Sequence, residues 1–200
     1  MEKEDVKMEI ANEDVLLKIE EAKKEYIAEN VTFISQNCIG GVIYHDMGQK
    51  FLSPTINLYF MANDFIKFVQ NLEYYLNKEL VMRNDTEVVT GLLDDIEIYF
   101  LHYHTNEEAL EKWNERKQRI NKNKIFVIQT DRDGFDDNSF EEFKKIKYNK
   151  ALITKNENWE NEEFVIYLPK YKNEDCVPDT IPEREFYRDN KIIRLINKVL

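Results

Sequence analysis

Two aspartates and an arginine stand together in the stretch TDRDG, residues 130–134, directly after the apolar run KIFVIQ. Carboxylates two residues apart, such as Asp131 and Asp133, offer hard oxygen ligands that suit Mg²⁺ or Mn²⁺ bound to a diphosphate. Arg132 would add a contact to a phosphate. An Asp-Gly turn explains the same letters without any ligand. The pattern therefore indicates either a divalent-metal site or a plain turn.

Two of the three histidines, His102 and His104, lie two residues apart in the apolar stretch IEIYFLHYH. On a strand this spacing places both imidazoles on one side, where they can share a metal ion or serve as a general base. His45 is a further candidate for the same site. The alternative is that these histidines end a strand and form hydrogen bonds with the backbone.

The stretch FISQNCIGGVIYHDMG, residues 33–48, resembles a buried strand followed by an abrupt turn into a short helix. The consecutive Gly40 and Gly41 would let a ligand approach backbone N–H groups, with Ser35 and Asn37 beside it. The spacing matches neither G-x-G-x-x-G nor the P-loop pattern, so neither of these nucleotide motifs is present. The alternative is a tight turn that requires glycine for steric reasons.

Cys38 lies at the expected start of that helix. A helix N-terminus favours the thiolate form, which is the reactive one, so Cys38 is a candidate nucleophile with His102 or His104 as its base. The alternative is a small buried side chain that only fills space. Asp94 and Asp95 precede a strand in GLLDDIEI, where one of them would pair with Arg132 or another cation of the site.

These residues need a scaffold that brings them together. Apolar runs predict strands at residues 31–35, 53–60, 96–104, 124–130, 151–154 and 163–168, and helical periodicity predicts helices over residues 13–28, 41–48, 63–77, 105–121, 139–146 and 189–200. Asn12 and Thr105 are the expected N-caps of two of these helices. Strands alternating with helices predict an α/β fold with three layers, a mostly parallel sheet covered on both faces and an antiparallel strand pair near the C-terminus. Ligands in such folds bind at the carboxyl ends of the strands.

The composition restricts the domain organisation and the partners. We expect an amphipathic helix within residues 1–30 that packs on a single α/β domain formed by residues 31–200. The chain has 28 Lys and Arg against 39 Asp and Glu, a net charge of −11, so its surface repels nucleic acid and anionic lipid. Without a signal peptide or an apolar stretch long enough to span a membrane, the expected location is the cytoplasm, with both cysteines reduced.

Four segments together resemble one known family. FISQNCIGGVIYHDMG, LSPTINLYFMANDFIKFVQNLEYYLN, LLDDIEIYFLHYHTNEEALEKWNERKQRIN and KIFVIQTDRDG occur in the order found in the bacterial domain of unknown function 1919 family, and the resemblance extends from Val31 to Leu168. Members carry Asn at the position of Gln36 and an aromatic residue at that of Ile39, so this chain departs from the family pattern there. Members are often labelled exopolysaccharide biosynthesis proteins, which implies a role in surface-polysaccharide synthesis.

Three functions remain open from the sequence. The leading one is a transferase that acts on an activated sugar, whose ligand would be a sugar-containing small molecule or a lipid-linked glycan precursor. Here the turn at residues 37–41 binds the anionic or sugar part of the ligand, and Asp131 and Asp133 hold Mg²⁺ or Mn²⁺ or the hydroxyls of the sugar. His102 or His104 is the general base. The second is a hydrolase or acyl transferase that uses Cys38. The third is a non-catalytic accessory protein of polysaccharide synthesis.

Overall fold

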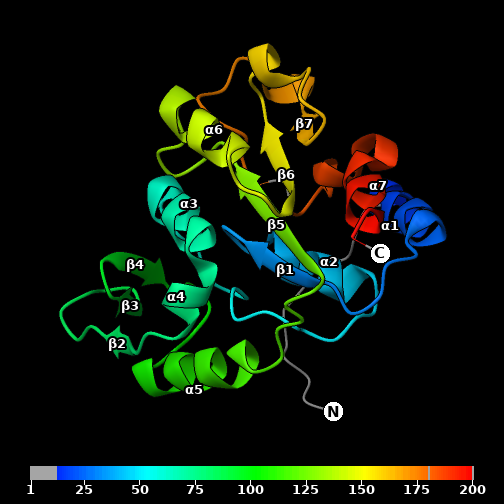
Figure 1. Ribbon diagram of the computed structural model, residues 1–200. Helices are drawn as coiled ribbons and strands as arrows, with labels where there is room; N and C mark the ends of the chain where they lie inside the picture. Colours follow the sequence, from blue (N-terminus) through cyan, green and yellow to red (C-terminus); the bar gives the residue numbers. More distant parts are fainter. Residues whose placement is uncertain (1–12, 180, 200) are drawn as a thin grey trace.

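Four parallel strands form the main sheet of the structure, a computed structural model that describes residues 13–179 and 181–199. They are β1 (Thr32–Ser35), β5 (Ile125–Thr130), β6 (Asn149–Thr154) and β7 (Val165–Tyr167), in the spatial order β1-β5-β6-β7 (Figure 1). Thr32 pairs with Ile125 at one end of the sheet and Leu152 with Val165 at the other. The predicted parallel sheet is therefore confirmed.

Helices cover both faces of this sheet (Figure 1). One face packs against α1 (Glu13–Glu25), α2 (Ile39–Asp46) and α7 (Lys191–Asn197), and the other faces α3 (Ala62–Gln70), α4 (Leu72–Leu76), α5 (Asn106–Lys117) and α6 (Asp137–Lys144). Side chains alternate along β5, so that Phe126 and Ile128 enter the first core while Ile125 and Val127 enter the second. This arrangement confirms the expected three-layer α/β fold.

A second, smaller sheet lies beside α3 and α4 and consists of β2 (Leu80–Met82), β3 (Thr90–Leu93) and β4 (Ile96–Tyr99), all antiparallel. The strand predicted over residues 96–104 ends at Tyr99 and is not part of the main sheet. The antiparallel strands lie in the middle of the chain, whereas β7 near the C-terminus is parallel to β6. β3 and β4 are antiparallel because a two-residue hairpin turn connects them, in which Asp94 has a φ of 60°.

The strand predicted over residues 53–60 does not form. This segment runs beside β1, but side chains occupy the hydrogen-bonding positions on that edge of the sheet. The amide of Ser35 donates to Thr55 Oγ1 (2.9 Å), and the amide of Phe33 donates to the hydroxyl of Tyr44 (2.9 Å). Only Tyr59 pairs with another strand residue, through an isolated bridge to Tyr99.

The predicted helices are present with some changes in their limits. The helix expected over residues 63–77 is divided into α3 and α4 at Asn71, whose φ of −125° is not helical. At α5 the hydroxyl of Thr105 accepts the amide of Glu108 (3.1 Å), as the capping pattern predicts. The expected cap Asn12 lies outside the described residues. Short 3₁₀ turns follow later in the chain: η1 (Glu157–Trp159), η2 (Pro169–Tyr171) and η3 (Glu185–Asn190).

The N-terminal helix α1 packs against η3 and α7, and its residues Val15, Ile19 and Ala22 are buried in the same core as α2. Within the described residues, no helix combines the length and the apolar character that crossing a membrane would require.

Candidate functional site

A buried hydrogen-bond network joins the loops that follow β1 and β5 at the carboxyl edge of the main sheet. The side-chain nitrogen Nε2 of Gln36 donates to Asp133 Oδ2 (2.7 Å) and to the carbonyl of Phe60 (2.7 Å). Its oxygen accepts the hydroxyl of Thr130 (2.9 Å) and the side-chain amide of Asn37 (3.1 Å). Gln36 is fully buried, and as the centre of the network it holds both loops in place. The sequence signal for it was a polar residue directly after a buried strand.

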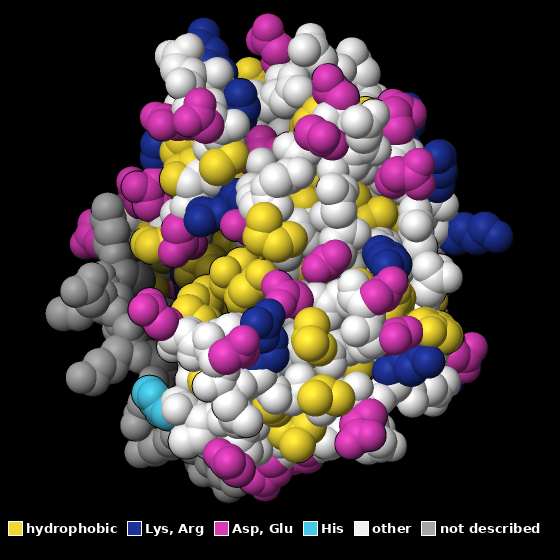
Figure 2. Space-filling model, turned by 90° about the vertical axis from the view of Figure 1, so that its left-hand side faces the viewer, with side chains coloured by type: hydrophobic (Ala, Val, Ile, Leu, Met, Phe, Trp, Pro, Cys, Tyr) yellow, Lys and Arg dark blue, Asp and Glu magenta, His cyan; other side chains and the backbone are white. Residues whose placement is uncertain are grey.

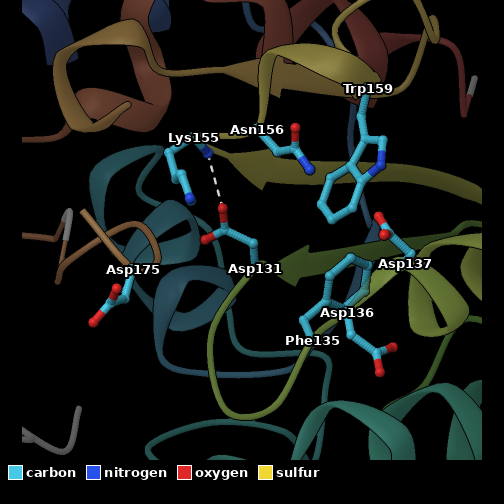
Figure 3. Close-up of a pocket in the computed structure, with 8 residues that line it drawn as sticks. All are labelled: Asp131, Phe135, Asp136, Asp137, Lys155, Asn156, Trp159 and Asp175. Atoms are coloured by element: carbon cyan, nitrogen blue, oxygen red, sulfur yellow. Dashed lines mark hydrogen bonds between the residues drawn. The ribbon is translucent and has the colours of Figure 1, made fainter. Parts of the chain in front are cut away.

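Asp131 connects three segments of the chain at the same edge. Its Oδ1 accepts the amide of Val177 (2.7 Å), and its Oδ2 accepts the hydroxyl of Thr154 (2.7 Å) and the amide of Lys155 (2.8 Å, Figure 3). The residue is 7% exposed. Its carboxylate therefore holds the loop after β6 and the segment around Val177 against β5.

Asp131 and Asp133, the predicted metal ligands, already accept hydrogen bonds from other parts of the chain. Both oxygens of Asp131 already accept hydrogen bonds from the chain, and Asp133 accepts one from Gln36. Across residues 13–179 and 181–199, no three His, Cys, Asp or Glu side chains are grouped to hold a metal ion. Asp133 and Gly134 have φ values of 56° and 85°. TDRDG thus forms the Asp-Gly turn that was the alternative interpretation, and Arg132 lies half-buried within it.

A shallow cavity of about 220 Å³ opens beside Asp131, where the loops after β5 and β6 meet (Figure 3). Two aromatic residues form its apolar part: Phe135 meets Trp159 edge to face, with ring centroids 5.6 Å apart. Trp159 in turn stacks on Phe140 with an interplanar angle of 8°, which fixes its ring. The polar lining consists of Asp131, Asp136, Asp137, Lys155, Asn156 and Asp175.

Some polar groups of the cavity already form hydrogen bonds with other described residues, and others do not. Asp136 caps α6 by accepting the amide (2.8 Å) and the hydroxyl (2.9 Å) of Ser139, and these hydrogen bonds lower the pKa of its carboxyl. Asn156 accepts the amide of Asn158 (3.1 Å). Asp137 is exposed, and within the described residues neither its carboxylate nor the ammonium of Lys155 has a recorded hydrogen bond. These two groups are available to a solute.

The glycine turn before α2 serves packing. A Cβ on Gly40 would lie 2.8 Å from the Cβ of Ser35, so the helix can approach β1 only without a side chain there. The amide of Gly40 donates to Ser35 Oγ (3.2 Å), and the amide of Ile39 donates to Asn37 Oδ1 (3.2 Å). In the turn predicted as an anion-binding site, the N–H groups of Ile39 and Gly40 are therefore already occupied, whereas Gly41 faces Ile56, with 3.4 Å between a Cβ built there and Ile56 Cγ2.

Cys38 does not have the environment of a nucleophile. Burial, together with the negative charge of Asp179, raises the pKa of its thiol to about 11. The predicted stabilisation of a thiolate at the helix N-terminus is therefore wrong for this residue. His45 lies on the exposed side of α2, with its Nδ1 3.5 Å from Asp46 Oδ1.

The other two predicted histidines and the aspartate pair lie on the second sheet or next to it. His102 and His104 are exposed in the turn after β4, so their expected placement on one face of a strand is wrong. The main-chain amide of His104 donates to Glu108 at the start of α5 (3.0 Å). Asp94 accepts the hydroxyl of Tyr74 (2.5 Å), and Asp95 accepts that of Tyr75 (2.8 Å), so neither pairs with Arg132.

The structure thus brings together Ser35, Asn37, Cys38, Asp131, Arg132 and Asp133 near the ends of β1 and β5, and it separates His45, His102, His104, Asp94 and Asp95 from them. The cavity residues Phe135, Asp137, Lys155, Asn156 and Trp159 were not predicted. Their only sequence signal was aromatic and polar residues within a few positions of the ends of β5 and β6.

Comparison with known proteins agrees with the resemblance seen in the sequence. Residues 12–199 match the family described as a domain of unknown function, DUF1919. An uncharacterised protein of Haemophilus influenzae is 33% identical over 152 residues, which cover 76% of this chain and 74% of that protein. The family match over residues 12–199 includes the main sheet, its helices and the residues that line the cavity. The chain therefore belongs to the domain of unknown function 1919 family.

Proposed function

We propose that this protein binds a sugar in the cavity at the carboxyl edge of the main sheet and acts as a transferase on an activated sugar in surface-polysaccharide synthesis. One observation carries the proposal: the aromatic residues Phe135 and Trp159 line the same opening as the polar residues Asp137, Lys155 and Asn156. The apolar C–H face of a pyranose packs on such rings while its hydroxyls bond to carboxylate, ammonium and amide groups.

The size of the cavity limits what it can enclose. Its volume of about 220 Å³ is below the roughly 300–1,000 Å³ of pockets that enclose a drug-sized ligand. A single sugar ring fits this space, whereas a whole sugar nucleotide does not. When the ring of the acceptor sugar occupies this space, the activated donor must bind on the neighbouring surface.

The transfer step requires a group that accepts a proton. The acceptor hydroxyl oxygen forms a bond to the anomeric carbon while the bond from that carbon to the phosphate oxygen breaks. A base removes the hydroxyl proton. We assign this role to Asp137 because it lines the cavity, whereas His102 and His104 lie in the turn after β4. Asp136 suits the role less because the hydrogen bonds from Ser139 lower its pKa.

The charge of the opening affects the choice of donor. Asp136, Asp137 and Asp175 line it, together with Lys155. A bare diphosphate would be repelled by this excess of carboxylates. We therefore expect a sugar nucleotide to bind only together with Mg²⁺ or Mn²⁺, as the complex that it forms with the cation in solution.

The test is binding and turnover of sugar nucleotides and lipid-linked glycan precursors with and without Mn²⁺, followed by saturation-transfer NMR and product analysis. We expect sugar protons of the bound ligand to show contact with aromatic protons. Asp137→Asn should keep binding within a few-fold and abolish turnover. Asp189→Asn is the matched control, because it removes the same charge from an exposed residue of η3.

Two results would reject parts of the proposal. Absence of both binding and turnover with every donor and precursor would reject the sugar site itself. Binding without turnover would reject the transferase and leave the accessory function. Cysteine chemistry is disfavoured because the pKa of Cys38 is raised to about 11, so little thiolate exists near neutral pH.

A further inference from the structure

The segment at residues 58–61 turns two side chains outward beside the candidate site. Leu58 and Phe60 are fully buried, whereas Tyr59 is half-buried and Met61 is 40% exposed, as expected for alternating side chains. The segment is fixed to the site, because the amide of Phe60 donates to the carbonyl of Gln36 (3.0 Å) and the amide of Ala62 to that of Asp133 (2.9 Å).

The two outward side chains lie between the second sheet and the loop after β5. Tyr59 stacks on Tyr99 of β4 with ring centroids 4.7 Å apart and an interplanar angle of 13°. At the other end, a Cβ on Gly134 would lie 3.8 Å from Met61 Cε, and Gly134 directly precedes Phe135 of the cavity. We call Tyr59, Met61 and Tyr99 the tyrosine ridge.

Acidic groups border this ridge. The hydroxyl of Tyr99 donates to Glu97 Oε2 (2.7 Å). Burial and then the charge of Asp133 raise the pKa of Tyr59, which agrees with a position next to the site. The nearby cation Arg83 is already paired with Asp85 and Glu97. On the side of the molecule shown in Figure 2, hydrophobic side chains are exposed in a hollow and among many acidic ones.

We propose that the tyrosine ridge binds further sugars of a neutral glycan chain whose terminal sugar occupies the cavity. This inference rests on the proposed function and specifies its acceptor as an oligosaccharide. The cavity holds one ring, so additional sugars must lie on adjoining surface, and the ridge adjoins it through Gly134. The half-buried rings of Tyr59 and Tyr99 offer their outer surface to the C–H faces of sugars, and the bordering carboxylates accept hydrogen bonds from sugar hydroxyls.

Other occupants fit the ridge less well. A nucleic acid or an anionic polymer would be repelled by the bordering carboxylates and by the net charge of −11. A protein partner or a second copy of the chain would need roughly 800 Å² of surface on each side for a stable interface. Three side chains in a row supply only a small part of such an area, but they match a single extended chain of sugars.

The experiment is calorimetric titration with neutral gluco-oligosaccharides and chito-oligosaccharides of increasing length, starting from the single sugar. For the wild-type protein we expect the affinity to rise about tenfold as sugars are added. Tyr99→Ala and Tyr59→Ala should abolish this gain without changing the affinity for the single sugar, and Tyr99→Phe, which keeps the ring, should retain it. Tyr74→Ala is the matched control, because Tyr74 is a 49% exposed tyrosine on α4 that is not part of the ridge.

The outcomes separate this inference from the proposed function. Affinity that does not depend on chain length, or a length gain that survives in Tyr99→Ala or is lost equally in Tyr74→Ala, would overturn the ridge as a binding site. If a ridge variant changed the sedimentation behaviour but not glycan binding, the ridge would be a contact between two copies of the chain and the glycan site would be rejected. If long glycans bind through Tyr59 and Tyr99 but Asp137→Asn changes neither binding nor turnover, the cavity assignment fails and the ridge remains.

Discussion

Replacement of Asp131 by alanine tests whether this carboxylate organises the site or holds a metal ion. In the structure it accepts three hydrogen bonds, from Val177, Thr154 and Lys155, and it is 7% exposed. Asp131→Ala removes the acceptor for all three donors at once. We expect a large loss of stability even though the residue lies at the edge of a cavity.

The size of the loss follows from the donors. Hydrogen bonds to a charged group contribute about 1.5–3 kcal/mol each, so three of them set an upper range of roughly 4.5–9 kcal/mol. Lys155 lines the cavity, where water can replace the lost acceptor in part, whereas Thr154 is fully buried. Val177 is fully buried, so its amide stays unpaired. We therefore expect the free energy of unfolding to fall by about 3–5 kcal/mol, a large share of the roughly 5–15 kcal/mol of a typical domain.

The assay is urea-induced unfolding followed by circular dichroism, with Asp175→Ala as the control. Asp175 lines the same cavity but is exposed and has no recorded hydrogen bond within the described residues, so the midpoint of that variant should match the wild type. A loss below about 1 kcal/mol for Asp131→Ala would contradict the structural role. If that variant unfolds like the wild type and loses only Mn²⁺-dependent donor binding, Asp131 is a metal ligand after all.

Three further predictions concern the packing and ionisation of the scaffold. Gly40→Ala should lower the free energy of unfolding by about 1–3 kcal/mol because its Cβ would meet β1 at 2.8 Å, whereas Gly41→Ala, whose nearest contact is 3.4 Å, should be neutral or slightly stabilising in thermal melts. Alkylation of Cys38 by iodoacetamide at pH 8 should be much slower in the folded than in the urea-unfolded chain, because the pKa of the thiol is raised to about 11 from an unfolded value of about 8.5. The stability that this thiol contributes should therefore be present below pH 8.5 and lost as the pH rises to about 11. Cys38→Ser should remove that pH dependence. Asp46→Ala should lower the free energy of unfolding in urea by about 3–5 kcal/mol, because the 3% exposed guanidinium of Arg184 loses the carboxylate that it pairs with. The double variant Asp46→Ala with Arg184→Met should recover part of this loss. An unchanged urea midpoint for the single variant would contradict this role of the pair.

The sequence predicted those parts of the fold that depend on local pattern. Strands buried on both faces, such as β1 and β5, appear as continuous apolar runs, and the cap at Thr105 follows from its spacing to Glu108. The hairpin around Asp94 was missed because an aspartate takes the positive φ for which glycine is the usual signal. Residues 53–60 have strand-like composition, but composition does not reveal that side chains already occupy the edge of β1.

The sequence predicted the edge of the sheet at which the candidate site lies, but it did not predict most of the residues that line the cavity. The carboxyl ends of parallel strands meet at one edge, so Asn37 and Asp131 lie where the sequence places them. The histidines were misplaced because their location depended on assigning β4 to the main sheet. Trp159 was missed because it belongs to a short 3₁₀ turn, and such turns carry no periodic signal.

The polar groups at the carboxyl edge of the main sheet differ in whether the chain already satisfies their hydrogen bonds. The side-chain amide of Gln36 uses both of its donors and both acceptor positions within the chain, so a ligand would have to break a complete network to bind it. Asp131 is equally engaged by its three donors. Asp137 and Lys155, by contrast, face the cavity with no recorded partner in the described part of the chain. The buried network therefore holds the loops at this edge in place, and Asp137 and Lys155 are the groups that the sugar of our proposal would contact without breaking it.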